Sequence, residues 1–176
     1  MTKDPFGAAD TEPNTTRPFA SETSAYLKSP AIVRYGCRSF DRQWIVADRR
    51  LLDRSRPELW AARRPGQVFV VEQHSQPIAD GPAVVFSALI PDAHHFNGRG
   101  GRVLPMMHPG GRANVAKGLL GALSTISGRA LSADDLVAYV AGVAAHPGFT
   151  QRFAEELDTP GVRIPITDDA ELFERA

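Results

Sequence analysis

Short apolar runs separated by turn residues fill the first two thirds of the chain. Each run is rich in Val, Ile, Phe or Tyr and is bounded by Gly, Pro or Asp, which is typical of short β-strands. The strands are expected at residues 31–35, 44–46, 68–72 and 83–90. Residues 97–111 are rich in glycine and hold Pro105 and Pro109, so they are expected to be mainly loop.

The last third changes to a helical period, with apolar residues three or four positions apart. This spacing predicts three helices, whose apolar stripes are Val115, Leu119, Leu123 and Ile126; Leu136, Tyr139, Val140 and Val143; and Phe149, Phe153 and Leu157. Ser132 is a favourable N-cap with Asp135 three residues later, and Pro147 can open the third helix. We therefore predict an α+β fold, with short mixed strands first and a three-helix C-terminal part after them.

The pattern also predicts the domain organisation. Residues 1–24 are rich in Pro, Thr, Ser, Asp and Glu without any period, so they are expected to be a disordered leader. Residues 25–176 are expected to form a single domain, because 176 residues can bury a sizeable core but not two full ones.

Composition changes this picture only through the distribution of charge. The chain has 20 basic and 20 acidic side chains, which excludes a globally basic nucleic-acid binder. The charges are nevertheless segregated: residues 34–64 hold nine arginines and four acids, and residues 93–133 hold four arginines, Lys117 and no acid. If these two segments share a face, they form a footprint for a polyanion. The alternative is that each arginine pairs with an acid from another segment.

Several other kinds of site find little support. Cys37 is the single cysteine, which excludes an internal disulfide and a multi-cysteine zinc site. His74, His94, His95 and Asp92 could bind a metal ion, but their spacing fits no compact ligand pattern. No cofactor is expected. The sequence has no signal-peptide pattern and no apolar run of membrane-spanning length, so a cytoplasmic location is expected.

An ordered set of short motifs resembles the C-terminal specificity domain of type ISP restriction–modification enzymes. The set begins with Arg38-Ser39-Phe40-Asp41-Arg42-Gln43-Trp44-Ile45 followed by Asp48, where Ser39 replaces the family's usual proline. It continues with Arg56-Pro57-Glu58-Leu59-Trp60 and Ser87-Ala88-Leu89-Ile90-Pro91-Asp92. It ends with Tyr139-Val140-Ala141-Gly142-Val143, His146-Pro147-Gly148-Phe149 and Arg163-Ile164-Pro165. The resemblance spans roughly residues 31–173.

The resemblance implies a domain that reads a DNA target and presents it to an adenine N6-methyltransferase. The sequence has no Asn/Asp-Pro-Pro-Tyr/Phe motif and no Walker lysine, so the resemblance implies recognition without catalysis. The expected partners are double-stranded DNA and a separate methyltransferase or nuclease subunit. The residues expected to contact DNA are the loop donors His95 and Asn97 and the arginines Arg38, Arg42, Arg49, Arg50, Arg54, Arg56, Arg99, Arg102 and Arg112.

Three alternatives to this assignment are left open by the residues. Arg38 and Arg42 could be structural, paired with Asp41 or Asp48. The chain could be a protein-interaction module derived from such a domain. It could also be a small metal-dependent hydrolase that uses the histidines and Asp92. Trp44 is expected in the core.

Overall fold

The computed structural model describes residues 31–38, 40–49, 51–53, 55–74, 84–96, 101–157 and 159–176. The predicted leader, residues 1–24, lies outside these ranges. The described elements are β1 (Ile32–Gly36), β2 (Arg42–Val46), α1 (Pro57–Ala61), β3 (Phe69–Gln73), β4 (Val84–Ser87), β5 (Gly101–Pro105), α2 (Leu119–Ser127), α3 (Ala133–Ala145), α4 (Pro147–Arg152), α5 (Ala154–Leu157) and α6 (Ala170–Arg175). The predicted α+β class is confirmed.

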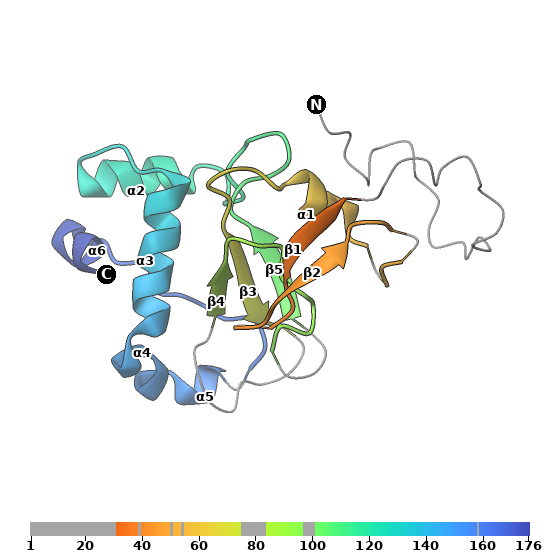
Figure 1. Cartoon of the computed structure of the whole chain (residues 1–176). Coiled ribbons are helices and arrows are strands. Elements are labelled where there is room, and N and C mark those ends of the chain that lie inside the picture. Colours follow the sequence, from red (N-terminus) through yellow and green to blue (C-terminus); the bar gives the residue numbers. More distant parts are fainter. Residues whose placement is uncertain are drawn as a thin grey trace, which may run out of the picture.

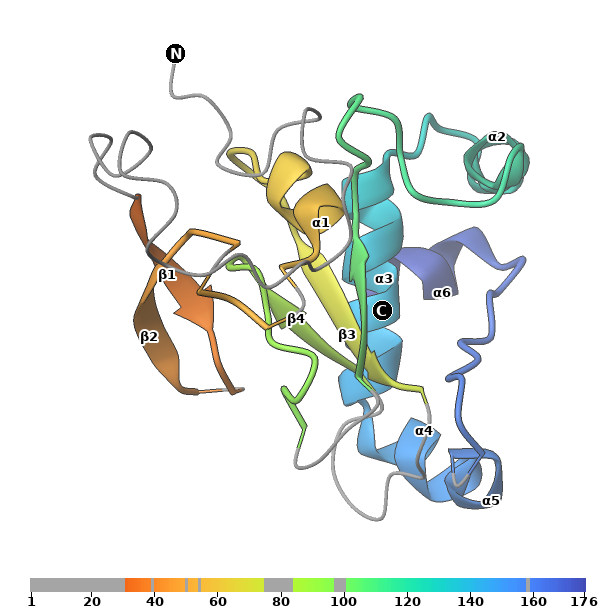
Figure 2. The ribbon, with the colours of Figure 1, turned by 90° about the vertical axis from the view of Figure 1, so that its right-hand side faces the viewer.

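The strands form two small antiparallel sheets. Strands β1 and β2 make a hairpin, and β3 lies between β4 and β5 in a three-stranded sheet. Helix α3 lies on one side of the three-stranded sheet, whereas the hairpin and α1 lie on the other (Figures 1 and 2). The hairpin therefore occupies the end of the molecule away from the C-terminal helices.

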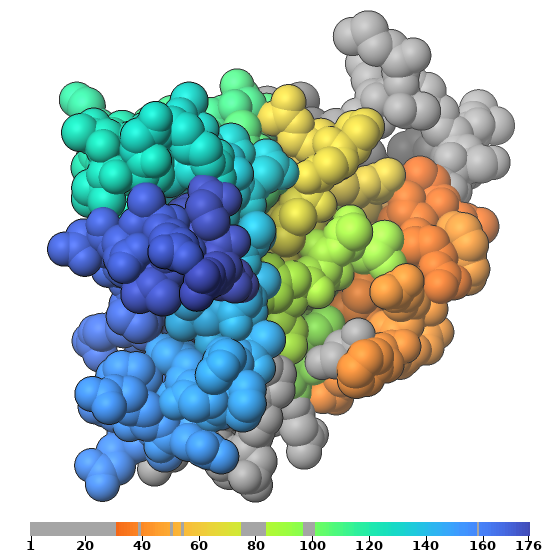
Figure 3. Space-filling view, turned by 90° about the vertical axis from the view of Figure 1, so that its left-hand side faces the viewer, coloured from red at the N-terminus to blue at the C-terminus, as the bar shows by residue number. Residues whose placement is uncertain are grey.

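Two hydrophobic clusters hold these parts. The first joins α1, β3 and the inner face of the hairpin, and its buried members are Ala47, Leu59, Trp60, Ala62, Phe69 and Ile90. The second joins α2, α3 and α6 through the buried residues Leu123, Leu131, Leu136, Tyr139 and Phe173. Figure 3 shows α2, α6 and the region of α3 and α4 as one continuous helical surface. Within the described residues, no helix has both the length and the apolar character needed to cross a membrane.

The C-terminal part differs from the predicted three helices. Helix α2 begins at Leu119 and not at Val115, because Gly118 has a positive φ of 85°. The predicted third helix is divided into α4 and α5 at Phe153. Helix α6 was not predicted, because six residues are too few for an apolar period. The five-residue α1 was missed for the same reason.

The strand predictions need two corrections. Strand β5 lies inside the glycine-rich stretch expected to be loop, where it completes the sheet beside β3. Its first residue, Gly101, donates to the Ala93 carbonyl, and a Cβ there would lie 2.6 Å from that oxygen. The glycine therefore allows the start of β5 to approach the backbone of the turn at Ala93 closely. The expected mixture of strand directions is not found within either sheet, where every described strand pair is antiparallel. A parallel pairing does occur in the isolated bridge between Gly36 and Pro91.

Candidate nucleic-acid interface

The β1–β2 hairpin presents one face to the core and the other to solvent. Val33, Tyr35 and Ile45 point inward against the first cluster. Because side chains alternate along a strand, the positions between them point outward. The outward pair Arg34 and Trp44 lie opposite each other in the register, and the guanidinium lies 5.0 Å from the centre of the indole ring.

Trp44 was expected in the core, but this prediction is wrong, because 65% of the residue is exposed to solvent. The reason is that the hairpin has only two strands, and no described element covers its outer face. The alternation along the strands could have predicted this exposure, because Val33 and Ile45 occupy the inward-facing positions next to Arg34 and Trp44.

A tight turn closes the hairpin. The backbone groups of Arg38 and Asp41 exchange two hydrogen bonds of 3.2 Å each, which leaves a two-residue loop. Phe40 lies in this loop and is 99% exposed. The Arg38 guanidinium donates to the Phe96 carbonyl at 3.0 Å, and this bond holds the Arg38 side chain against the segment that follows β4. An apolar ring thus projects from the tip of the hairpin between arginines.

Backbone hydrogen bonds join the hairpin to the segment after β4. The Gly36 N–H donates to the Ile90 carbonyl at 2.9 Å, and the Asp92 N–H donates to the Gly36 carbonyl at 2.8 Å. A Cβ at Gly36 would lie 3.4 Å from Ser87 Oγ. The end of β1 is thereby fixed beside the end of β4.

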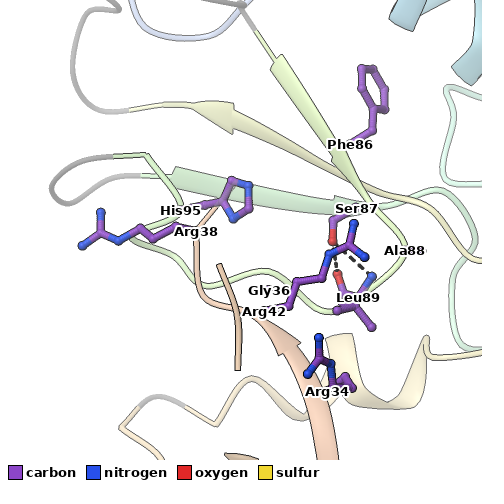
Figure 4. A pocket seen from close by; sticks show the side chains of 9 residues that line it. All are labelled: Arg34, Gly36, Arg38, Arg42, Phe86, Ser87, Ala88, Leu89 and His95. Atoms are coloured by element: carbon purple, nitrogen blue, oxygen red, sulfur yellow. Dashed lines mark hydrogen bonds between the residues drawn. The ribbon is translucent and has the colours of Figure 1, made fainter. Parts of the chain in front are cut away.

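A pocket of about 250 Å³ lies at this junction (Figure 4). Its lining combines three arginines with a histidine and the end of β4: Arg34, Gly36, Arg38, Arg42, Phe86, Ser87, Ala88, Leu89 and His95. In Figure 4, Arg42 reaches toward Ser87 and Leu89, whereas Arg38 extends away on the other side. Among the described residues, the Arg42 guanidinium has no hydrogen-bond or ion-pair partner.

His95 is the buried polar group of this pocket. Only 5% of the residue is exposed, and its Nδ1 atom is buried without a hydrogen-bond partner. Burial lowers the pKa of His95, and the positive charge of Arg38 lowers it further. The hydrogen bond with the Gly36 backbone and the negative charge of Asp92 act in the opposite direction, but the pKa remains lowered overall. The imidazole is therefore neutral near pH 7.

A hydrogen-bond network lies behind the pocket wall. Arg56 Nη2 donates to the Tyr35 hydroxyl at 2.8 Å and to the Pro91 carbonyl at 2.6 Å, and Tyr35 donates to Asp92 Oδ2 at 3.1 Å. Burial alone would raise the pKa of Asp92, but hydrogen bonds from His94 and Tyr35, with the charge of Arg56, lower it overall. The Arg56 guanidinium thus already has partners within the protein.

The predicted DNA contacts are only partly brought together. Arg38, Arg42 and His95 meet at the pocket, and Arg34, which was not predicted, joins them. Arg56 lies in the network, and Arg102 forms an ion pair with the buried Glu72 across β5 and β3. Arg49 also has an interaction partner. Arg112 is exposed in the segment between β5 and α2. The residues outside the described ranges are Arg50, Arg54, Asn97 and Arg99.

Neither the metal-dependent hydrolase nor a reaction at the Cys37 thiol finds support in the described residues. Among the described residues, no three His, Cys, Asp or Glu side chains lie close enough to hold a metal ion, so His74, His94, His95 and Asp92 form no ligand set. Burial raises the pKa of the Cys37 thiol, and Asp41 and Asp92 raise it further. The thiol is therefore protonated near pH 7 and is a poor nucleophile.

These features define a class: a small α+β domain that presents an arginine-lined hairpin and pocket at one end and a helical surface at the other. The family model of the type ISP C-terminal specificity domain matches residues 8–176, and the chain belongs to this family. The motifs that suggested the same family from the sequence start at residues 38–45.

One solved structure supports the fold. The chain is similar to a chain in the cryoEM structure of a DrdV–DNA complex, with a TM-score of 0.63 and 22% sequence identity. The similarity covers 85% of this chain and 15% of that chain, so this chain spans a small part of the length of its neighbour. No curated protein matches the sequence.

Proposed function

We propose that this chain recognises double-stranded DNA for a type ISP restriction–modification system, and that the hairpin end of the domain faces the DNA. The observation that carries the proposal is the group of arginines at one pocket, Arg34, Arg38 and Arg42. Arginine is well suited to this task because its planar fork matches phosphates and guanine edges. The DrdV chain of similar fold was determined in a complex with DNA, which supports the same assignment.

We further propose that the chain contributes recognition and leaves the methylation chemistry to another polypeptide or domain. The support is the family description, which is that of a specificity domain. The helical surface of α2, α3 and α6 lies away from the hairpin, so both ends can be occupied at once (Figure 1). This arrangement suits a domain that holds DNA at one end and a methyltransferase at the other.

Duplex binding measured by fluorescence anisotropy tests the proposal. For the wild-type chain, we expect affinity to fall by about 10³-fold or more between roughly 50 and 200 mM salt, since several phosphate contacts release counterions. The triple variant Arg34→Ala, Arg38→Ala, Arg42→Ala should bind about tenfold or more weakly at the lower salt concentration.

The matched control removes three positive charges from the helical end, with Arg152→Ala, Arg163→Ala and Arg175→Ala. All three residues are exposed, so the variant should fold and should bind DNA nearly as well as the wild type. Equal losses in both triple variants would mean that binding follows total charge and not the hairpin end. Circular dichroism of each variant shows whether the fold is retained.

A further inference from the structure

The pocket at the hairpin end combines positive charge with a hollow of defined size. Its volume of about 250 Å³ equals roughly eight water molecules at about 30 Å³ each. Three arginines are among its lining residues, and no Asp or Glu is. Asp92, the acid near His95, is occupied by hydrogen bonds from Tyr35 and from His94. The pocket is therefore suited to an anion.

Some polar groups of the pocket already have partners within the protein, and others do not. Arg38 is held by the Phe96 carbonyl, and Arg34 stacks on Trp44. Ser87 Oγ is engaged by the backbone of Leu89, from which it accepts at 3.1 Å and to which it donates at 2.7 Å. Arg42 and the Nδ1 atom of His95 remain without partners among the described residues. A buried polar atom without a partner is unfavourable, so an occupant that satisfies Nδ1 is favoured.

We propose that this pocket binds one phosphate diester of the DNA backbone, with Arg42 and the protonated imidazole of His95 as its hydrogen-bond donors. The inference rests on the proposed function and names the group of the DNA that enters the pocket. Arg34 adds positive charge from the pocket lining, and Arg38 adds charge from beside it, where it is held by the Phe96 carbonyl.

The chemistry favours a phosphate over a base edge. Guanidinium groups only donate, and phosphate diester oxygens only accept, so the two match without any further group. A base edge offers donors as well as acceptors, whereas the pocket lining is dominated by arginines, which only donate. A phosphate also projects from the duplex and can enter a hollow that the edge of a stacked base cannot reach.

Phosphate binding should be linked to the protonation of His95. The groups that face its imidazole are the Gly36 backbone and Asp92, which favour the proton, and Arg38, which opposes it. Arg34 and Arg42 add positive charge across the pocket. A phosphate introduces a negative charge next to the ring, which raises the pKa of His95 from its lowered value in the free protein. Binding should therefore take up a proton, and affinity should rise as the pH falls from about 7.5 to 5.5.

The salt dependence of duplex binding tests the role of Arg42. Loss of one phosphate contact should reduce the slope of log K against log salt by about 0.9. We expect this decrease for Arg42→Ala on duplexes of unrelated sequence, and a retained slope for Arg42→Lys and for the distant Arg163→Ala. An unchanged slope with a loss of affinity for particular sequences only would overturn the inference and make Arg42 a base reader.

The pH dependence tests His95 on the same duplexes. The wild-type affinity should increase toward acid pH, and His95→Gln should remove that increase while the protein stays folded. His108→Gln is the matched control, since His108 does not line the pocket. An equal pH dependence in wild type and His95→Gln would contradict the inference.

A probe titration separates this inference from the proposed function. Dimethyl phosphate and inorganic phosphate are added to the full chain while the histidine ring signals are followed by NMR, with His95→Gln to assign the signal. A saturable shift of the His95 signal with dimethyl phosphate supports a diester site even if duplex binding is weak. A shift with inorganic phosphate alone indicates a site for free phosphate, and no shift with either probe overturns the inference whatever the duplex result.

Discussion

At the scale of single residues, arginines of one segment have different roles. Arg34 and Arg42 point outward from the hairpin, whereas Arg56 turns inward to Tyr35 and Pro91. Arg56 also has a φ of 49°, a left-handed conformation that is uncommon outside glycine. Alternation along the strands predicts the outward direction of Arg34, but the partner of Arg56 lies 35 residues away in the chain. Such a contact depends on the tertiary fold, so the sequence shows that the arginines share a segment but not which of them point outward and which turn inward.

The network behind the pocket gives a prediction for Tyr35. Tyr35→Phe removes a hydroxyl that accepts from Arg56 and donates to Asp92, so it should lower the free energy of unfolding by about 1–3 kcal/mol. Urea denaturation measures the change. Gln43→Ala is the control, because Gln43 lies opposite Tyr35 in the register but is exposed, and it should change the stability by less than about 0.5 kcal/mol.

The same residue makes stability depend on alkaline pH. Burial raises the pKa of Tyr35 to about 12, with Asp92 adding to the shift and Arg56 opposing it. A raised pKa means that the contribution of Tyr35 is complete below its unfolded value of 10.0 and is lost as the pH rises through about 12. The stability difference between wild type and Tyr35→Phe should therefore shrink across that range. A constant difference would show that the hydroxyl is not buried as described.

At the scale of elements, local signals predicted best where they are complete within a few residues. Ser132 and Asp135 form a capping box at the start of α3, as the sequence suggested. Strand β5 was missed because the glycine-rich sequence around its start indicates loop, while its place in the sheet comes from β3 and from contact with Ala93. Helix α6 packs through Phe173, which stacks on Tyr139 at 4.4 Å. Tertiary packing therefore decided both elements that the pattern could not predict.

The capping box supplies a prediction for α3. Ser132→Ala removes the hydroxyl that accepts from the Asp135 N–H, and it should cost about 1 kcal/mol of stability. The hydroxyl of Thr125 lies exposed within α2 and bonds only to the Gly121 carbonyl, so Thr125→Ala should have little effect or stabilise slightly. Thermal unfolding of the two variants compares them. A similar loss in both would mean that the cap contributes nothing specific.

At the scale of the whole molecule, the two hydrophobic clusters stabilise different parts of the fold. The first lies beneath the hairpin and the pocket, and the second holds the C-terminal helices. The sequence predicted the order of strands before helices, but the division of the core into two clusters requires knowledge of which faces meet. The family motifs fall on both parts, which explains why the resemblance extended along most of the chain.

This division predicts separable effects of core substitutions. Leu136→Ala, in the second cluster, should destabilise the protein by about 2–5 kcal/mol through a cavity, yet the folded fraction should bind DNA normally. Ile90→Ala, in the first cluster, should lower both stability and affinity, since a cavity left by the buried side chain lies directly behind the Gly36–Ile90 junction at the pocket. Anisotropy well below the unfolding midpoint measures affinity for each variant. A loss of affinity in Leu136→Ala would show that the two ends are coupled.

The junction at Gly36 has a consequence for how such a domain acquires a new DNA target. The hairpin is joined to the segment after β4 by the main-chain atoms of Gly36, Ile90 and Asp92, which are the same whatever side chains surround them. Outward positions outside the pocket lining, such as Trp44, can therefore vary without shifting the frame that presents them. Mutation can explore new recognition surfaces here at little risk to folding, so specificity and stability can evolve on separate sets of residues.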